Sequence, residues 1–239
     1  MRHAVNGLGT VLSPEKLLDL TQPLGTATIL WPGSRPFAAD VEGEVDTDGF
    51  YARDLSLPEH SGTHLDAPAH FVSDGATVDE VGIGSLVRPA VRLDVRELVG
   101  DDSSFTLTAA MVETIEARDG QIPAGAVVLV CTGWDRFHRD AERYRGAGDS
   151  LAFPGIGADA AQLFVDRRVA GIGIDTLSVD AGHANTFPTH HITLPAGLWH
   201  LEGLTRLERV PARGAWLVAA AVPIVDGSGA PTRAFAILP

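Results

Sequence analysis

The sequence predicts a single domain of the mixed α/β class. Its 239 residues are 45% hydrophobic and 21% charged, which is enough apolar material for one sizeable core. Short apolar runs rich in β-branched residues alternate with segments of helical periodicity, and neither an internal repeat nor an obvious linker separates them. Strands and helices that alternate in this way predict a mixed α/β core, but they leave the strand order open.

The N-terminal part contains the first three strand candidates. Residues 1–14 are rich in glycine and other small residues, and we expect a loose arm there. Residues 26–31 carry β-branched side chains and stop at a Pro-Gly turn signal, and residues 50–57 form a second strand-like run. Residues 87–95 alternate weakly, and Pro89 predicts an edge position or an irregularity.

A helix is well marked at residues 108–118. Thr108 can cap its first turn and Gly120 can end it, and apolar residues recur at helical spacing between them. The other elements follow from the same two patterns: strands at 126–131 and 169–174, a helix at 158–168, and a long apolar run, closer to a strand than to a helix, at 215–225.

Net charge and cysteine content indicate which binding partners and which cellular compartment to expect for this protein. The net charge of −13 argues against a nucleic-acid partner, because phosphate binding needs a basic surface. No window approaches the run of roughly 18 apolar residues that a membrane helix needs, and the N-terminus lacks the apolar stretch of a signal peptide. Cys131, the one cysteine, lies in an apolar strand, so we interpret it as a core residue rather than a nucleophile. A lone cysteine fits a reducing compartment, and we expect a cytoplasmic protein.

The stretch HSGTHLDAPAHF, residues 60–71, is dense in side chains that bind metals. It holds three of the nine histidines together with Asp66. Gly62 and Pro68 make a helix improbable there, so a loop or a strand-to-turn segment would point these side chains toward one centre. Two imidazoles and a carboxylate suit Zn²⁺, or Mn²⁺ where oxygen ligands are more numerous. The alternative is a hydrogen-bonded polar loop, but the density of ligand-type side chains favours metal binding.

A catalytic metal site usually takes further ligands from distant parts of the chain. Residues 189–203 concentrate such side chains, although an amphipathic surface stretch is an equal alternative there. The downstream candidates are His183, His190, His191, His200, Glu202 and Glu208. The sequence contains no G-x-S-x-G elbow, no G-x-x-x-x-G-K-[ST] phosphate loop and no G-x-G-x-x-G. These absences favour a metal-activated water over a serine nucleophile.

The pattern His60-x-Gly-Thr-His64-x-Asp66-x-Pro-x-His70 resembles the signature of the cyclase-like metal-dependent hydrolases at all seven positions. This family includes bacterial kynurenine formamidase and isatin hydrolase. The similarity includes a Trp-Pro-Gly at 31–33, a Thr-Gly-Trp at 132–134 and a Gly-Ile-Asp-Thr-x-Ser-x-Asp at 173–180, and it runs from about residue 19 to residue 226. We therefore divide the chain into an N-terminal arm, residues 1–18, and one hydrolase domain, residues 19–239.

The resemblance implies a set of metal ligands. His60, His64 and Asp66 would hold a first divalent cation, and Asp66 would also reach a second. The family has a later histidine ligand followed twelve residues on by a glutamate ligand, and His190 and Glu202 have that separation. His191 is the competing choice for the second cation, at a separation of eleven. One or two cations per chain, Zn²⁺ or Mn²⁺, are expected.

The resemblance also implies the roles of the other site residues and the shape of the whole protein. His70 would be the acid/base rather than a ligand. Trp31 would line the substrate pocket, and Trp134 or Trp199 could stack on an aromatic substrate as well. A swivelling β/β/α fold and a homodimer or homotetramer are further implications of the family.

These features predict an enzyme that hydrolyses an aryl or cyclic amide by metal-activated water. The leading substrate is the small aromatic amide N-formylkynurenine, which would make the protein an arylformamidase. The alternative is isatin or another lactam or lactone. A second alternative is a metal-binding relative without hydrolytic turnover, or a polyketide-type cyclase.

Overall fold

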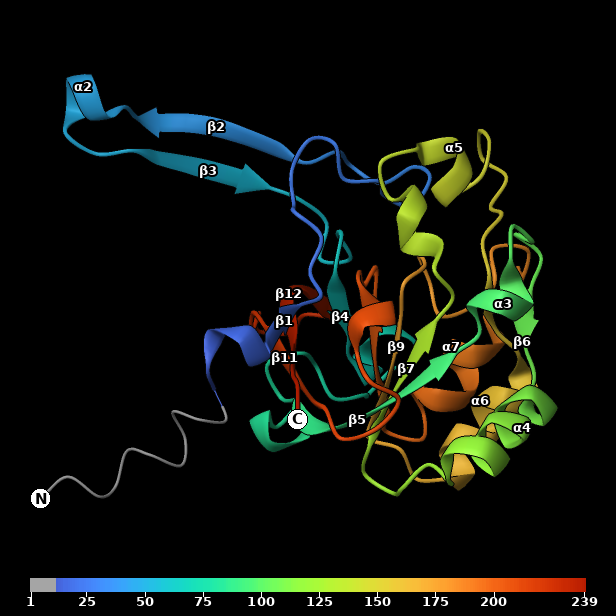
Figure 1. Ribbon diagram of the computed structural model, residues 1–239. Coiled ribbons are helices and arrows are strands. Elements are labelled where there is room, and N and C mark those ends of the chain that lie inside the picture. The colour runs from blue at the N-terminus through green and yellow to red at the C-terminus, as the bar shows by residue number, and fades with distance from the viewer. Residues whose placement is uncertain (1–11) are drawn as a thin grey trace, which may run out of the picture.

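A barrel-like sheet forms the centre of the protein, and helices cover one side of it (Figure 1). The computed structural model describes residues 12–239, so most of the expected arm lies outside the described residues. In chain order, the strands of this sheet are β1 (Leu17–Asp19), β4 (His64–Asp66), β5 (Val87–Asp94), β7 (Val127–Cys131), β9 (Gly171–Ile174), β10 (Trp199–Glu202), β11 (Trp216–Ala221) and β12 (Gly229–Ile237). Their spatial order is β1-β12-β11-β5-β7-β9-β10-β4, and β12 also pairs with β4, which closes seven strands into a ring.

The middle of the sheet is parallel. β5, β7, β9 and β10 run in the same direction, and every residue of β7 and β9 is buried. Parallel strands covered on both faces read as continuous apolar runs, which is why these segments stand out in the sequence. Cys131, at the end of β7, is fully buried, and burial raises the pKa of its thiol, in agreement with its interpretation as a core residue.

Three helices pack on the outer face of these strands: α4 (Ala109–Asp119), α6 (Ala158–Asp166) and α7 (Pro188–Thr193). The Thr108 side chain accepts a hydrogen bond from the Met111 amide at the start of α4, as its capping role predicts. One apolar cluster lies between the helices and the sheet, and a second fills the inside of the ring. The predicted single α/β domain is therefore confirmed. In residues 12–239 no helix has the length and apolar character to span a membrane.

The expected strand at residues 26–31 is wrong. This segment is an irregular connection that begins with a turn at Gly25, whose amide donates to the Thr28 hydroxyl at 2.9 Å. The Thr28 amide in turn donates to the Gly25 carbonyl at 3.0 Å. A threonine that bonds the backbone locally competes with strand pairing, so its β-branched side chain gives a false strand signal here.

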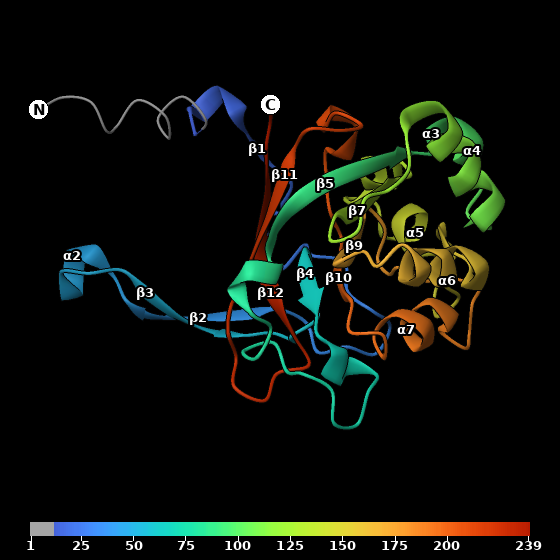
Figure 2. The same ribbon diagram turned by 90° about the horizontal axis from the view of Figure 1, so that it is seen from below.

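The strand expected at residues 50–57 exists, but it lies in a separate two-stranded hairpin. β2 (Ala38–Gly43) pairs with β3 (Ala52–Ser56), and the single-turn α2 (Val45–Asp48) joins them. Figures 1 and 2 show this hairpin projecting from the body, away from the helical side.

The remaining elements are short. They are α3 (Arg96–Val99), α5 (Ala141–Tyr144), the strand pair β6 (Thr106–Leu107) and β8 (Gly155–Ile156), and 3-10 helices at Pro14–Lys16, Pro68–His70, Ile83–Ser85, Trp134–Phe137 and Leu207–Arg209. β1 begins at Leu17 and pairs with β12, so residues 17 and 18, which we assigned to the arm, belong to the sheet.

Candidate metal centre and active site

Two neighbouring strands bring the centre of the site together. β4 runs antiparallel to β10, in a register that sets His200 opposite Asp66 and Glu202 opposite His64. Because alternate residues of a strand share a face, His64 and Asp66 point the same way, as do His200 and Glu202. All four side chains are buried. The motif at residues 60–71 and the distant segment at residues 189–203 therefore lie side by side, as a shared metal site would require.

The segment just before β4 adds His60. Its Nδ1 lies 2.7 Å from Asp66 Oδ1, and its Nε2 lies 2.9 Å from the Ser228 hydroxyl. Ser228 Oγ donates to Glu59 Oε2 at 2.8 Å, so it accepts the hydrogen bond from His60 Nε2–H. The other ring nitrogen, Nδ1, therefore faces Asp66 Oδ1 at hydrogen-bonding distance. Gly229 makes room for the ring, because a Cβ there would lie 2.6 Å from His60 Cε1.

Helix α7 adds His190. Its Nδ1 donates to Asp180 Oδ2 at 2.5 Å, and its Nε2 faces the cluster, 3.5 Å from both Asp66 Oδ2 and Glu202 Oε1. His191 is exposed, lies with its ring centroid 5.0 Å from that of Phe71, and belongs to neither group of possible metal ligands. The geometry thus places His190, not the competing His191, beside the other candidate ligands.

His64 follows the same rule as His60 and His190. Its Nδ1 donates to the Gly62 carbonyl at 3.0 Å, and its Nε2 lies 3.2 Å from Asp66 Oδ1 and 3.4 Å from Glu202 Oε2. In each ring one nitrogen is held by an outer partner and the other faces Asp66, and those of His64 and His190 face Glu202 as well. Outer partners that fix ring orientation in this way are typical of histidines that bind metals.

The donor atoms fit divalent cations. Asp66, His190, His200 and Glu202 each offer a ligand atom within 4.8 Å of the others, and His60, Asp66 and His70 form a second such group. Asp66 belongs to both groups, and its Oδ2 is buried with no hydrogen bond among the described residues. Bonds of about 2.1 Å to a tetrahedral ion separate the ligand atoms by about 3.4 Å. Separations of 3.2 to 3.6 Å between unbonded donor atoms match that geometry.

Without a cation, protons supply the positive charge of the cluster. Burial opposes the charged form of His190, but hydrogen bonds to Asp180 and Asp66 raise its pKa to about 10. Burial likewise opposes the charge on His64, and the negative charge of Asp66 raises the pKa of His64 well above its usual value. A site that holds protons so tightly is one where a cation would replace them.

His70 has a different environment. It leaves the loop in the 3-10 helix after β4 and stacks on His60, with ring centroids 3.9 Å apart. Burial lowers the pKa of His70 to about 4, so the ring is neutral at pH 7. Its position within the second donor group also permits metal contact, so its role as acid/base remains a prediction.

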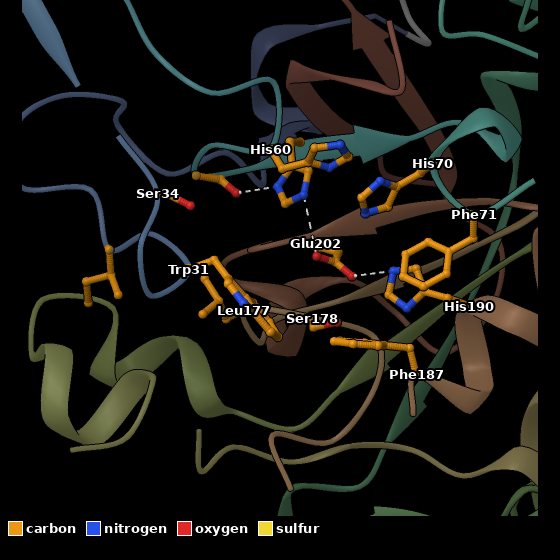
Figure 3. A pocket seen from close by; sticks show the side chains of 13 residues that line it. Trp31, Ser34, His60, His70, Phe71, Leu177, Ser178, Phe187, His190 and Glu202 are labelled. Carbon is orange, nitrogen blue, oxygen red and sulfur yellow. Dashed lines mark hydrogen bonds and ion pairs between the residues drawn. The ribbon is translucent and has the colours of Figure 1, made fainter. Parts of the chain in front are cut away.

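The cluster lines one side of a cavity of about 290 Å³. Aromatic and aliphatic side chains form most of the rest of the lining, and two serines and a glycine complete it: Ile29, Trp31, Phe71, Leu177 and Phe187, with Ser34, Ser178 and Gly62. In Figure 3, the Glu202 carboxylate lies among the histidine rings, and Trp31 and Phe187 face them across the pocket. The centroids of these two aromatic rings are 5.8 Å apart. No arginine or lysine is among the described residues that line this cavity.

Several expectations need adjustment. Trp134 and Trp199 are buried in the core and do not line the pocket; Trp134 donates to the Tyr144 carbonyl, and Trp199 packs against Gly171. His183 and Glu208 are exposed and lie outside the donor groups.

Sequence reasoning missed the pocket residues Phe71 and Phe187 and the partner of His190. Asp180 was visible as the last residue of the motif at 173–180, but only the position of α7 shows that it holds His190. Phe187 directly precedes α7 and has left-handed backbone angles, which no local pattern predicts.

The fold and the ligand-type side chains together define a barrel-like α/β protein whose apolar pocket ends on a buried histidine and carboxylate cluster suited to a divalent cation. The Cyclase family model matches residues 18–181, and the chain belongs to this family.

The relatives are hydrolases. Isatin hydrolase of Roseibium aggregatum is 34% identical in an alignment 259 residues long, which covers 100% of this chain and 98% of that protein. Kynurenine formamidase of Bacillus cereus is 28% identical over 220 residues, 91% of this chain and 95% of that protein. The crystal structure of an isatin hydrolase bound to the product analogue thioisatinate has a TM-score of 0.92 at 31% identity, covering 98% of this chain and 97% of that one. The prediction of a hydrolase of this family is confirmed.

Proposed function

We propose that this protein hydrolyses a compact cyclic aryl amide of the isatin type. The observation that carries the proposal is the pocket: an uncharged, aromatic cavity that ends on the buried histidine and carboxylate cluster. Similarity to isatin hydrolase over the full chain supports the same substrate class. The cations would be held by His60, His64, Asp66, His190 and Glu202.

N-formylkynurenine, the leading substrate expected from the sequence, becomes the second candidate. It carries an amino-acid group with a carboxylate, and a buried carboxylate needs a cationic partner. The described lining contains no arginine or lysine to supply one. The cavity is also near the small end of the range for ligand pockets, about 300 Å³. The kynurenine formamidases among the relatives keep this substrate in the test panel.

Divalent cations in this site would lower the pKa of water and polarise the amide carbonyl. His70 is neutral at pH 7 because burial lowers its pKa, so it can accept a proton as water attacks the carbonyl carbon. It can then deliver that proton to the amide nitrogen when the C–N bond breaks. Ring opening of a cyclic amide in this way yields a carboxylate and an amine on one product.

The apolar part of the pocket would orient the substrate. Trp31 and Phe187 are tilted against each other at 46°, and Phe71 stacks on His190 with centroids 4.5 Å apart. Flat aromatic rings bind well between such faces and edges. The same side chains exclude water from around the reacting carbonyl, which strengthens the electrostatic interactions there.

The test is a substrate panel with defined cations. Protein stripped with a chelator and reloaded with Zn²⁺ or Mn²⁺ is assayed on isatin, N-formylkynurenine and an aliphatic lactone, with bound metal measured by elemental analysis. We expect isatin to turn over fastest, and only with a cation present. His64→Ala should lose metal and turnover together, whereas the exposed His191→Ala should lose neither. Metal-loaded protein that hydrolyses none of these compounds would favour the binding or cyclase alternative.

The hairpin supports a second copy of this chain as partner. Two isolated strands are marginally stable in water, yet this hairpin exposes large apolar side chains: Val41 in β2 and Leu55 in β3 are each 54% accessible, and Tyr51, just before β3, is 61% accessible. A homodimer or homotetramer would cover them. Light scattering on the protein and on Tyr51→Glu tests this, with Ile83→Glu, an exposed apolar position outside the hairpin, as the matched control. A monomeric wild-type protein would contradict the assembly.

A further inference from the structure

His200 is a buried histidine whose role the ligand assignment above leaves open. It lies in β10 directly opposite Asp66, two residues before Glu202 and on the same face. Its side chain is fully buried, with 0% of its surface accessible. A buried imidazole needs partners for both ring nitrogens, and only one of the two has a partner among the described residues.

The hydroxyl of Thr193 determines which nitrogen of His200 carries the proton. Thr193 Oγ1 donates to the Thr189 carbonyl at 2.6 Å, one helical turn earlier in α7. A hydroxyl has a single proton, so toward His200 Nε2, at 2.7 Å, it can only accept. His200 therefore carries its proton on Nε2, and Nδ1 is a free lone pair.

That lone pair faces another acceptor. Asp66 Oδ2 lies 3.6 Å from His200 Nδ1, and both atoms are buried without a hydrogen bond among the described residues. The separation is too long for a hydrogen bond but matches the spacing of two ligands on one ion, about 3.4 Å. His200 also belongs to the group of residues that includes His190 and Glu202, each of which offers a ligand atom within 4.8 Å of the others.

We propose that His200 binds the second cation through Nδ1 and that Thr193 fixes the ring tautomer that makes this contact. The inference rests on the proposed metal site and adds a ligand to it. Asp66, His190, His200 and Glu202 would then form a complete set of four ligands from the chain. The first cation, held by His60, His64 and Asp66, would keep a position for water. Closed four-ligand sites are typical of tightly held ions, whereas open ones are typical of catalytic ions.

Two variants separate metal binding by His200 from a structural role. His200→Asn places its side-chain oxygen near the position of Nδ1 and loses the contact to Thr193. His200→Gln places its amide near the position of Nε2, keeps that contact and has no donor at Nδ1. Cations are titrated into chelator-stripped protein against a chromophoric competitor, and unfolding curves check that each variant folds.

We expect two cations in the wild type, the tighter of them lost selectively in His200→Gln. Loss of an outer partner of a metal ligand costs about 10–100-fold in affinity, so loss of the ligand itself should cost about 100-fold or more. His200→Asn should retain the second cation better than His200→Gln. Thr193→Val should weaken the second cation by about 10–100-fold, and Thr193→Ser should restore it.

The opposite order of the two variants, or wild-type affinity for both cations in His200→Gln, would overturn the role of His200 while leaving the proposed function intact. A wild-type protein that binds no cation would instead overturn the proposed function. NMR of the cobalt-loaded protein gives an independent measurement, with His200→Gln used to assign the signal. Binding through Nδ1 predicts a hyperfine-shifted, slowly exchanging Nε2–H signal from His200, and its absence with two cobalt ions bound would contradict the proposal.

Discussion

Removal of the cations should make the stability of this protein depend on pH in a range where the loaded protein is insensitive. In the cation-free protein, protonated His190 supplies positive charge beside Asp66 and Asp180. Its pKa is raised from 6.5 to about 10, because hydrogen bonds to Asp180 and Asp66 outweigh the effect of burial. In the unfolded chain the same imidazole titrates near 6.5.

The sign follows from proton linkage. A group whose folded pKa is raised contributes stability that is fully present below its unfolded pKa and is lost as pH rises through its folded pKa. For His190 the window is therefore pH 6.5 to about 10. Within it the free energy of unfolding should fall by about 1.4 kcal/mol per pH unit, or about 5 kcal/mol in all. The pKa of His64 is also raised, so that residue adds to the decrease.

The assay is urea unfolding at a series of pH values, with chelator or with saturating cation. In the loaded protein these imidazoles are already deprotonated, so its curve should be nearly flat between pH 7 and 9. His190→Gln in the cation-free state should have a shallower slope, and the exposed His191→Ala should match the wild type. A cation-free curve that is flat or rises with pH would refute this account of the cluster.

Three further variants test other parts of the structure. His70→Ala should keep its cations and lower kcat by about 10²–10⁴-fold; elemental analysis that shows metal lost along with the rate would make His70 a ligand. Phe187→Leu should raise KM for isatin by about 2–10-fold and leave an aliphatic lactone unaffected, because an aromatic contact contributes about 0.5–1.5 kcal/mol. Asp175 accepts from Thr132 at 2.5 and 3.0 Å and from the Gly133 amide at 2.7 Å, so Asp175→Asn must turn an NH₂ toward a donor. It should cost about 1–3 kcal/mol in urea unfolding, and an unchanged midpoint would contradict this network.

The elements predicted well are those whose signal is local. α4 has a capping threonine and a terminating glycine, and β7 and β9 are apolar because both their faces are covered. Capping residues and buried apolar runs lie within the element itself or next to it. Such an element can therefore be predicted without knowing which strands or helices it packs against.

The elements predicted poorly depend on distant partners. β12 contains Pro231 and was not expected, although it pairs with β1, β4 and β11 and closes the ring. Residues 26–31 have strand-forming side chains but no strand beside them. Pairing between segments more than a hundred residues apart leaves no local mark, so the closed order of strands could not be derived from periodicity.

The site shows the same division. The alternation of His64 and Asp66 places both on one face once β4 is a strand, and that much follows from spacing. The role of Asp180 and the tautomer of His200 depend on where α7 lies, because His190 of this helix contacts Asp180 and Thr193 contacts His200 of β10. A sequence contains these residues but not the contact of a threonine hydroxyl with an imidazole, which exists only in the folded chain.

The position of Asp66 links the site to the closure of the barrel. β4 is three residues long, and it is the strand through which both β10 and β12 complete the ring. The carboxylate of Asp66, its last residue, is fully buried and faces Glu202 across a group of imidazoles. Two carboxylates at this depth repel each other unless positive charge lies between them, and such charge must come from protons or from cations. The positive charge that this cluster holds, from protons or from cations, thus also keeps β4 in the ring. Binding of cations and closure of the barrel would therefore stabilise each other.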